Sequence, residues 1–122
     1  MIDEGGTFLL TGGMSSANEY TGTVSRYGVD GWIEDLQDLN IGRDRHACTS
    51  YRNNDNVRVN LVCGGYTTNP NGGGRATNTC EINLEGSNTW TMAQPLPLYN
   101  TNFRLYNIDN HVFMIGETFI NF

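Results

Sequence analysis

The sequence predicts an all-β fold made of repeated units of short strands, and three observations lead to this prediction. The 122-residue chain contains 15 glycines and only 16% charged residues, which suits short strands and many turns better than helices. Short runs of β-forming residues alternate with clusters of Gly, Asn and Asp along the chain. One apolar run, together with the double glycine that ends it, returns 52 residues further on.

The strands can be placed one after another from these runs. Short apolar or alternating stretches predict strands at residues 7–11, 21–27, 43–51, 57–63, 77–84 and 89–92. Residues 102–107 and 111–115 are expected to form a hairpin around Asp109-Asn110. Residues 66–76 are expected to be the longest loop and to lack regular structure, because Asn69-Pro70 and three successive glycines interrupt strand pairing.

The repeat is the strongest signal in the sequence. The apolar run before Gly12-Gly13 aligns with the run before Gly64-Gly65, and a third copy ends at Gly116-Glu117, where only the first glycine is kept. An internal period near 50 residues, with several short strands in each unit, is typical of a β-propeller blade. The repeat therefore predicts consecutive blades.

The motif residues come in the same order in two units. The second unit contains an Arg-x-x-His segment, a glycine pair, an isoleucine where a tyrosine is usual, and a tryptophan: Arg43, His46, Gly64, Gly65, Ile82 and Trp90. The first unit supplies Gly12, Gly13, Tyr27 and Trp32. This order resembles the Kelch repeat over nearly the whole chain. The resemblance implies four-stranded antiparallel blades of a Kelch-type β-propeller, in which the second strand of each blade ends at the glycine pair.

The resemblance also implies that these repeat residues are structural. Glycine lets backbones approach where a Cβ would clash, and tryptophan fills the space between neighbouring sheets. We therefore expect the two glycine pairs, Trp32 and Trp90 to lie in the core. Arg43 and His46 are expected to link neighbouring blades by hydrogen bonds rather than to take part in chemistry.

The same frame divides the chain, residues 1–122, into parts of three blades. Residues 7–36 correspond to strands two to four of one blade, residues 43–92 to a complete blade, and residues 102–116 to the first two strands of a third. Propellers close with about four to eight blades. The expectation is therefore an incomplete propeller, either a fragment or one part of an oligomeric ring.

Function is expected in the loops, since loops on a rigid scaffold carry most binding residues. Four loops should emerge on one face, at residues 15–20, 40–44, 66–75 and 99–102. Tyr and Arg are favoured interface anchors, and the candidate residues for binding a partner are Tyr20, Tyr66, Arg75, Tyr99 and Asn100. The alternative is that these loops are solvated turns without a binding role. The leading interpretation is a non-enzymatic protein-interaction module, as Kelch propellers generally are.

Composition narrows the classes of partner. The formal net charge is −6 and the seven basic residues are all Arg, so a nucleic-acid role is not expected. No run approaches the roughly 20 apolar residues of a membrane span. The three Cys and two His show no metal-binding spacing, and neither a metal nor a cofactor is expected.

An enzyme is the alternative function. Kelch-like propellers occur in copper oxidases and similar folds in sialidases, so the fold does not exclude catalysis. A copper site would need clustered ligands, and His46 and His111 lie far apart in the sequence. The segment that ends at Thr89-Trp90 resembles the Asp-box of sialidases only at these two residues.

The cysteines leave one question open. If strands 43–51 and 57–63 pair around Asp55-Asn56, Cys48 and Cys63 would lie opposite each other. A disulfide at this position would imply an oxidising compartment. The alternative is two buried thiols, which is a common state of cysteine.

Overall fold

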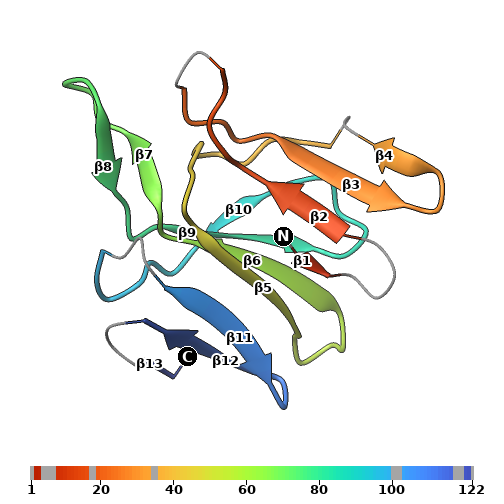
Figure 1. Ribbon diagram of the computed structural model, residues 1–122. Helices are drawn as coiled ribbons and strands as arrows, with labels where there is room; N and C mark the ends of the chain where they lie inside the picture. Colours follow the sequence, from red (N-terminus) through yellow and green to blue (C-terminus); the bar gives the residue numbers. More distant parts are fainter. Residues whose placement is uncertain are drawn as a thin grey trace.

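The computed structural model describes residues 2–3, 8–16, 19–33, 36–99, 103–116 and 120–121, and this part of the chain contains strands and no helix (Figure 1). The strands pair antiparallel into two four-stranded sheets, one three-stranded sheet and one two-stranded hairpin. The predicted all-β class with antiparallel four-stranded units is confirmed.

The first sheet has the order β1-β2-β3-β4. It comprises β1 (Ile2–Asp3), β2 (Phe8–Thr11), β3 (Val24–Gly28) and β4 (Gly31–Ile33). Strand β1 was not expected from the sequence, because two residues are too short to show a periodic pattern. It pairs with β2 through Ile2 and Leu9, which are both buried.

In the second and third sheets, too, the strands lie side by side in the order in which they occur along the chain. The second sheet runs from β5 (Ala47–Arg52) through β6 (Arg58–Cys63) and β9 (Cys80–Leu84) to β10 (Thr91–Ala93). The third comprises β11 (Arg104–Ile108), β12 (His111–Ile115) and β13 (Ile120–Asn121), so it has one strand more than the two that were expected. Asp109 and Asn110 both have positive φ, as a tight hairpin turn requires, and they join β11 to β12 as predicted.

Residues 66–76 differ from the prediction. They form a separate two-stranded hairpin, in which β7 (Tyr66–Thr68) pairs with β8 (Gly74–Ala76). The prediction of a loop without regular structure was wrong. Pro70, Gly72 and Gly73 all fall inside the turn, where the positive φ of the two glycines closes the hairpin. Three residues on each side are left to pair.

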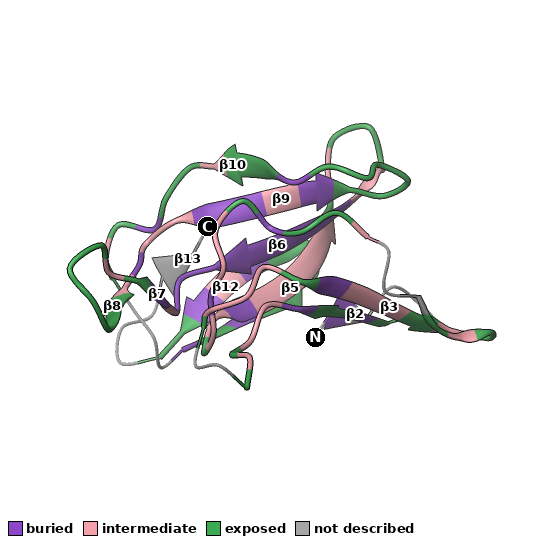
Figure 2. Ribbon diagram, turned by 90° about the horizontal axis from the view of Figure 1, so that it is seen from above, coloured by how far each residue is buried: buried purple, intermediate pink, exposed green. Residues whose placement is uncertain are grey.

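The three sheets stack one behind another, with an apolar core between each neighbouring pair (Figures 1 and 2). Leu9, Val24, Val62 and Trp90 belong to the core between the first and second sheets. The core between the second and third sheets includes Leu61 and Met114. Strand β5 contacts both β1 and β11, so the sheets approach each other through their first strands.

The register of the second sheet corrects the cysteine hypothesis. Cys48 pairs with Val62, whereas Cys63 pairs with Ala47 on one side and with Cys80 on the other. The structure contains a disulfide between Cys63 and Cys80, and Cys48 lies outside it. The observed pairing of β5 with β6 is shifted by one residue from the predicted pairing. Such a shift turns a side chain to the opposite face of the sheet. Cys48 therefore faces the first sheet, while Cys63 faces the third.

Candidate partner-binding rim

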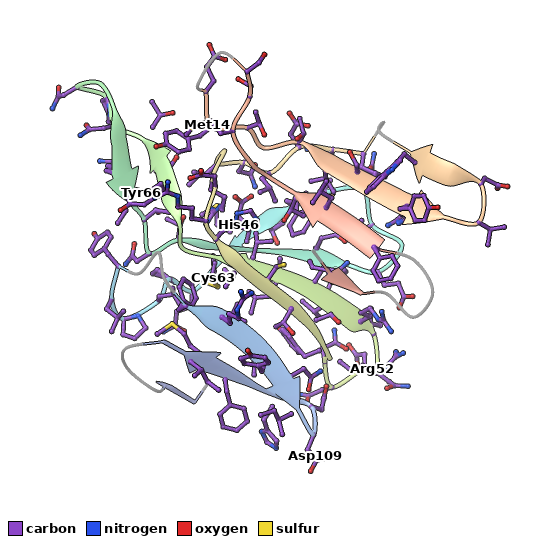
Figure 3. The ribbon with its side chains drawn as sticks, viewed as in Figure 1. Met14, His46, Arg52, Cys63, Tyr66 and Asp109 are labelled. Carbon is purple, nitrogen blue, oxygen red and sulfur yellow. A yellow bond between two sulfur atoms is a disulfide. The ribbon has the colours of Figure 1, made fainter. Side chains whose placement is uncertain are left out.

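The glycine pairs lie at one end of the stacked sheets, and we call this end the rim. It comprises residues 12–16, 19–22, 40–46 and 64–78. Figure 3 shows Met14, His46 and Tyr66 near this end, while Arg52 and Asp109 lie at the opposite end of the strands. Segments more than 50 residues apart in the sequence are thus brought together at one end of the molecule.

An ion pair between buried side chains supports the rim from below. Arg43 Nη2 lies 2.9 Å from Glu81 Oε2, and neither side chain is exposed to solvent. Arg43 also donates to the backbone carbonyl oxygens of Gly64 and Thr79. Burial lowers the pKa of Arg43, and the neighbouring Glu81 carboxylate opposes this shift. The guanidinium stays charged at neutral pH, since Arg does not lose its proton in proteins.

Glu81 was missed by the sequence analysis. Its Oε1 accepts hydrogen bonds from the backbone N–H and side-chain amide of Asn40, and its Oε2 accepts one from the backbone N–H of Ile41. The connection that leads from the first sheet to the second is therefore held by a side chain of β9. One acidic residue within the apolar strand 80–84 was the available signal, because buried carboxylates need several partners.

His46 joins the first two sheets. Its Nε2 shares a 2.9 Å hydrogen bond with Thr11 Oγ1 at the end of β2, and its Nδ1 has no hydrogen-bond partner among the described residues. Burial, assisted by the positive charge of Arg43, lowers the pKa of His46 to about 4. The imidazole is therefore neutral at pH 7. His46 thus makes the expected hydrogen bond between the first two sheets, whereas the side chain of Arg43 bonds to Gly64, Thr79 and Glu81 of the second unit.

The glycine pairs make room for the segment that carries these two residues. A Cβ on Gly12 would collide with the carbonyl oxygen of Arg43, and one on Gly65 would collide with that of Asp44. Gly12 has a φ of 68° and Gly65 one of 89°, a region that favours glycine. One glycine of each pair, Gly12 and Gly65, is therefore required for close backbone packing against the Arg-x-x-His segment.

Tyr66 lies beside this segment at the surface. Its backbone N–H and C=O exchange hydrogen bonds with those of Asp44, and the Arg45 guanidinium lies 5.5 Å from the centre of its ring. Thr67 Oγ1 donates a 2.8 Å hydrogen bond to the carbonyl oxygen of Gly42. Arg45 is exposed and has a φ of 52°, which is uncommon for a residue other than glycine. The hairpin β7–β8 and the connection to β5 thus form one continuous surface.

The first sheet contributes Tyr20 to the same surface. Tyr20 forms a β-bridge with Met14, and its hydroxyl lies where a Cβ on Gly74 would be. Loop 15–20 and hairpin β7–β8 are therefore in contact. Arg75, one residue further along β8, is exposed.

The remaining predicted binding residues, Tyr99 and Asn100, are not among the residues of the rim. Tyr99 is two-thirds exposed and lies in the connection from β10 to β11, which begins at the same end of the second sheet as the disulfide. Asn100 lies outside the described residues. The structure thus brings Tyr20, Tyr66 and the residues around Arg75 together. Sequence reasoning missed Arg45, whose contact with Tyr66 depends on the packing of two separate segments.

One predicted core position and one predicted repeat equivalence need correction. Trp90 is 5% exposed, as expected, but Trp32 is 51% exposed. Trp32 pairs with Tyr27 on the face of the first sheet that turns away from the second, where no described residue covers it. The residue equivalent to Tyr27 is Asn83 rather than Ile82, because β9 pairs with β6 one residue further along than the sequence alignment implied.

The described ranges contain neither a cluster of metal ligands nor a membrane-spanning helix. No three His, Cys, Asp or Glu side chains gather there as metal ligands. We also find no helix among these residues with the length and apolar character needed to cross a membrane.

Comparison with known proteins bears on the fold alone. No protein-family model and no curated protein matches the chain. Its fold is similar to that of a solved structure described as "Structure of YjhT", with a TM-score of 0.69 and 17% sequence identity. The similarity covers 93% of this chain and 32% of that chain, so the present sequence spans about a third of the neighbour's length.

Proposed function

We propose that this chain is part of a Kelch-type β-propeller that binds a protein partner through the rim and catalyses no reaction. The observation that carries the proposal is the convergence of Tyr20, Tyr66 and Arg45 on one surface from three separate segments. Arg75 pairs with Thr67 and points to the other side of the hairpin. Tyr and Arg supply large contact areas with a polar end, and they dominate the energy of many protein interfaces.

The support beneath this surface favours binding. Arg43 and Glu81 hold the backbone of the rim by hydrogen bonds, and His46 bonds to the hydroxyl of Thr11, so the surface side chains project from a pre-ordered framework. A pre-ordered surface loses less conformational entropy when a partner binds. The three buried residues are committed to structural contacts. No observation singles out a catalytic role for them.

The proposal can be tested with peptides selected against the chain from a random display library. We expect selected peptides to bind the unaltered chain and to lose affinity roughly 10-fold or more for Tyr66→Ala and for Arg45→Ala. Arg52→Ala is the matched control, because this exposed arginine lies at the opposite end of the strands (Figure 3).

Two outcomes would contradict the proposal. Equal binding by the unaltered chain and both rim variants would place the interaction elsewhere. Glycan hydrolysis or stoichiometric copper uptake by the chain would favour the enzyme alternative instead. Circular dichroism of each variant checks that the β-sheet content is retained.

A further inference from the structure

The hairpin of the rim has one strand whose outer edge is paired, β7, and one whose outer edge is open, β8. The N–H and C=O of Tyr66 on β7 exchange hydrogen bonds with those of Asp44, so they point away from β8. In an antiparallel pair, directly opposite residues point these groups either toward each other or away from each other, in alternation along the strands. Ala76 lies opposite Tyr66, so its N–H and C=O point away from β7.

Gly74 has the same orientation, because it precedes Ala76 by two residues on β8. The pair between them, Thr67 and Arg75, is therefore the one whose N–H and C=O groups face each other. No hydrogen bond from another described segment reaches the N–H or C=O of Gly74 or Ala76. Strand β8 also lies on the side of the hairpin that is farther from the sheets (Figures 1 and 2). We call this outer side of β8, at Gly74 and Ala76, the open edge.

The chain's own backbone already pairs with the same edge just beyond β8. Asn78 follows Ala76 by two residues, and its C=O accepts a 2.7 Å hydrogen bond from the N–H of Leu96. The side-chain amide of Asn78 donates to the C=O of Leu96 in return. A further extended segment placed beside Gly74 and Ala76 would continue this pairing along the hairpin.

We propose that the rim binds its protein partner by strand addition, in which an extended segment of the partner pairs with the open edge. Gly74 and Ala76 each offer one N–H and one C=O, and a strand presents its own groups on one side at the same spacing of two residues. Main-chain hydrogen bonds of this kind supply affinity, and alternate side chains supply specificity. The inference rests on the proposed function, because it describes how the rim would hold the partner.

The surroundings of the open edge determine which side chains the added strand should carry. Gly74 belongs to the face of the hairpin on which Tyr20 packs, since the Tyr20 hydroxyl lies where a Cβ on Gly74 would be. Arg75 is exposed and points to the other face. Side chains of neighbouring strands interact on each face, and opposite charges attract there. We therefore expect a segment in which an apolar or aromatic residue beside Tyr20 alternates with an acidic residue beside Arg75.

Amide hydrogen exchange, measured with and without the peptides selected from the display library, tests the pairing directly. In the free chain, the amides of Gly74 and Ala76 should exchange faster than those of Thr67 and Arg75, which are bonded within the hairpin. A bound peptide should slow the exchange of Gly74 and Ala76 by about 10-fold or more. Saturation with a peptide that leaves both amides exchanging as fast as before would overturn the inference.

A proline variant removes one donor of the open edge. Ala76→Pro deletes the outward N–H and no hydrogen bond to β7, and proline is tolerated at edge positions of this kind. It should weaken peptide binding roughly 10-fold or more. Ala76→Ser keeps the N–H, so it is the matched control and should bind as the unaltered chain does. Peptides N-methylated at alternate residues give the same test without a variant, and one of the two methylation patterns should abolish binding.

The outcomes separate this inference from the proposed function. Peptides that lose affinity for Tyr66→Ala but bind Ala76→Pro and both N-methylated forms unchanged would contradict strand addition and leave the rim as the binding surface. Peptides that bind without any dependence on Tyr66 or Arg45 would contradict the proposed function, and the inference would fall with it.

Discussion

The first and second sheets of this protein carry the same repeat, yet equivalent positions have different surroundings. Trp90 in the second sheet is buried, while Trp32 in the first is half exposed. The buried Glu81 of β9 corresponds to Ser25 of β3, and the Cys63–Cys80 disulfide corresponds to the unbonded pair of Thr11 and Val24. The second sheet packs on a sheet at each side, whereas the described residues cover the first sheet on the side of the second sheet.

The repeat motif therefore decides toward which side of its sheet a side chain points, but it does not decide whether that side chain is buried. The register of β3 and β4 directs Trp32 to the same side of its sheet as Trp90 occupies in the second. Burial then depends on whether another sheet covers that side. The expected contribution of a repeat residue to stability therefore depends on its place in the stack, and three measurements follow.

The largest expected effect concerns the ion pair between Arg43 and Glu81, a residue whose equivalent in the first sheet is Ser25. Arg43→Met should lower the free energy of unfolding by about 3–5 kcal/mol, because the Glu81 carboxylate would be left buried without its charged partner. Urea denaturation followed by circular dichroism measures the loss. The double variant Arg43→Met/Glu81→Met should recover much of it. A single variant that is as stable as the unaltered chain would show that the pair does not hold the rim.

The tryptophan pair gives the most direct test of the comparison. Trp90→Ala should cost about 3–5 kcal/mol of unfolding free energy because it leaves a cavity in the core between the sheets. Trp32→Ala should cost less than about 1 kcal/mol, because its side chain is half exposed. Urea denaturation measures both costs. Equal costs for the two variants would contradict the comparison.

The smallest expected effect concerns His46, which links the two sheets. Its pKa of about 4 in the folded chain lies below the value near 6.5 expected for the unfolded chain. The unfolded state therefore binds the proton first. The stability contributed by neutral His46 is complete above pH 6.5 and is lost as the pH falls toward 4. The loss should approach about 1.4 kcal/mol per pH unit between pH 6 and pH 5.

Denaturation midpoints measured from pH 7 to pH 5 test this dependence, because most carboxylates stay ionised in that range. His46→Gln should flatten the curve, because it removes the group that takes up the proton. An identical slope for the unaltered chain and His46→Gln would assign the pH dependence to other groups.

Much of the fold could be predicted because it depends on local properties. The ends of β2 and β6 follow from glycine pairs, and the β11–β12 turn follows from Asp109-Asn110, since these residues tolerate positive φ. Hairpin 66–76 was missed although its turn residues were recognised. Three-residue strands carry too little pattern to be distinguished from loop, and β7 is held partly by its bridge to Asp44.

The candidate site was only partly predictable for a different reason. Tyr20, Tyr66 and Arg75 could be named from residue type and loop position. The contact of Arg45 with Tyr66, and of Tyr20 with Gly74, joins segments that are 21 and 54 residues apart. Such contacts depend on how the hairpin folds back onto the first sheet.

The sequence by itself determined the all-β class, the repeat and the residues that end its strands, because backbone conformation and strand periodicity are properties of short segments. Only the tertiary structure decided the pairing of Cys63 with Cys80, the ion pair of Arg43 with Glu81 and the exposure of Trp32. Each of these depends on strand register or on a neighbouring sheet. A one-residue shift in register changes the face of a whole strand, and burial requires a second surface.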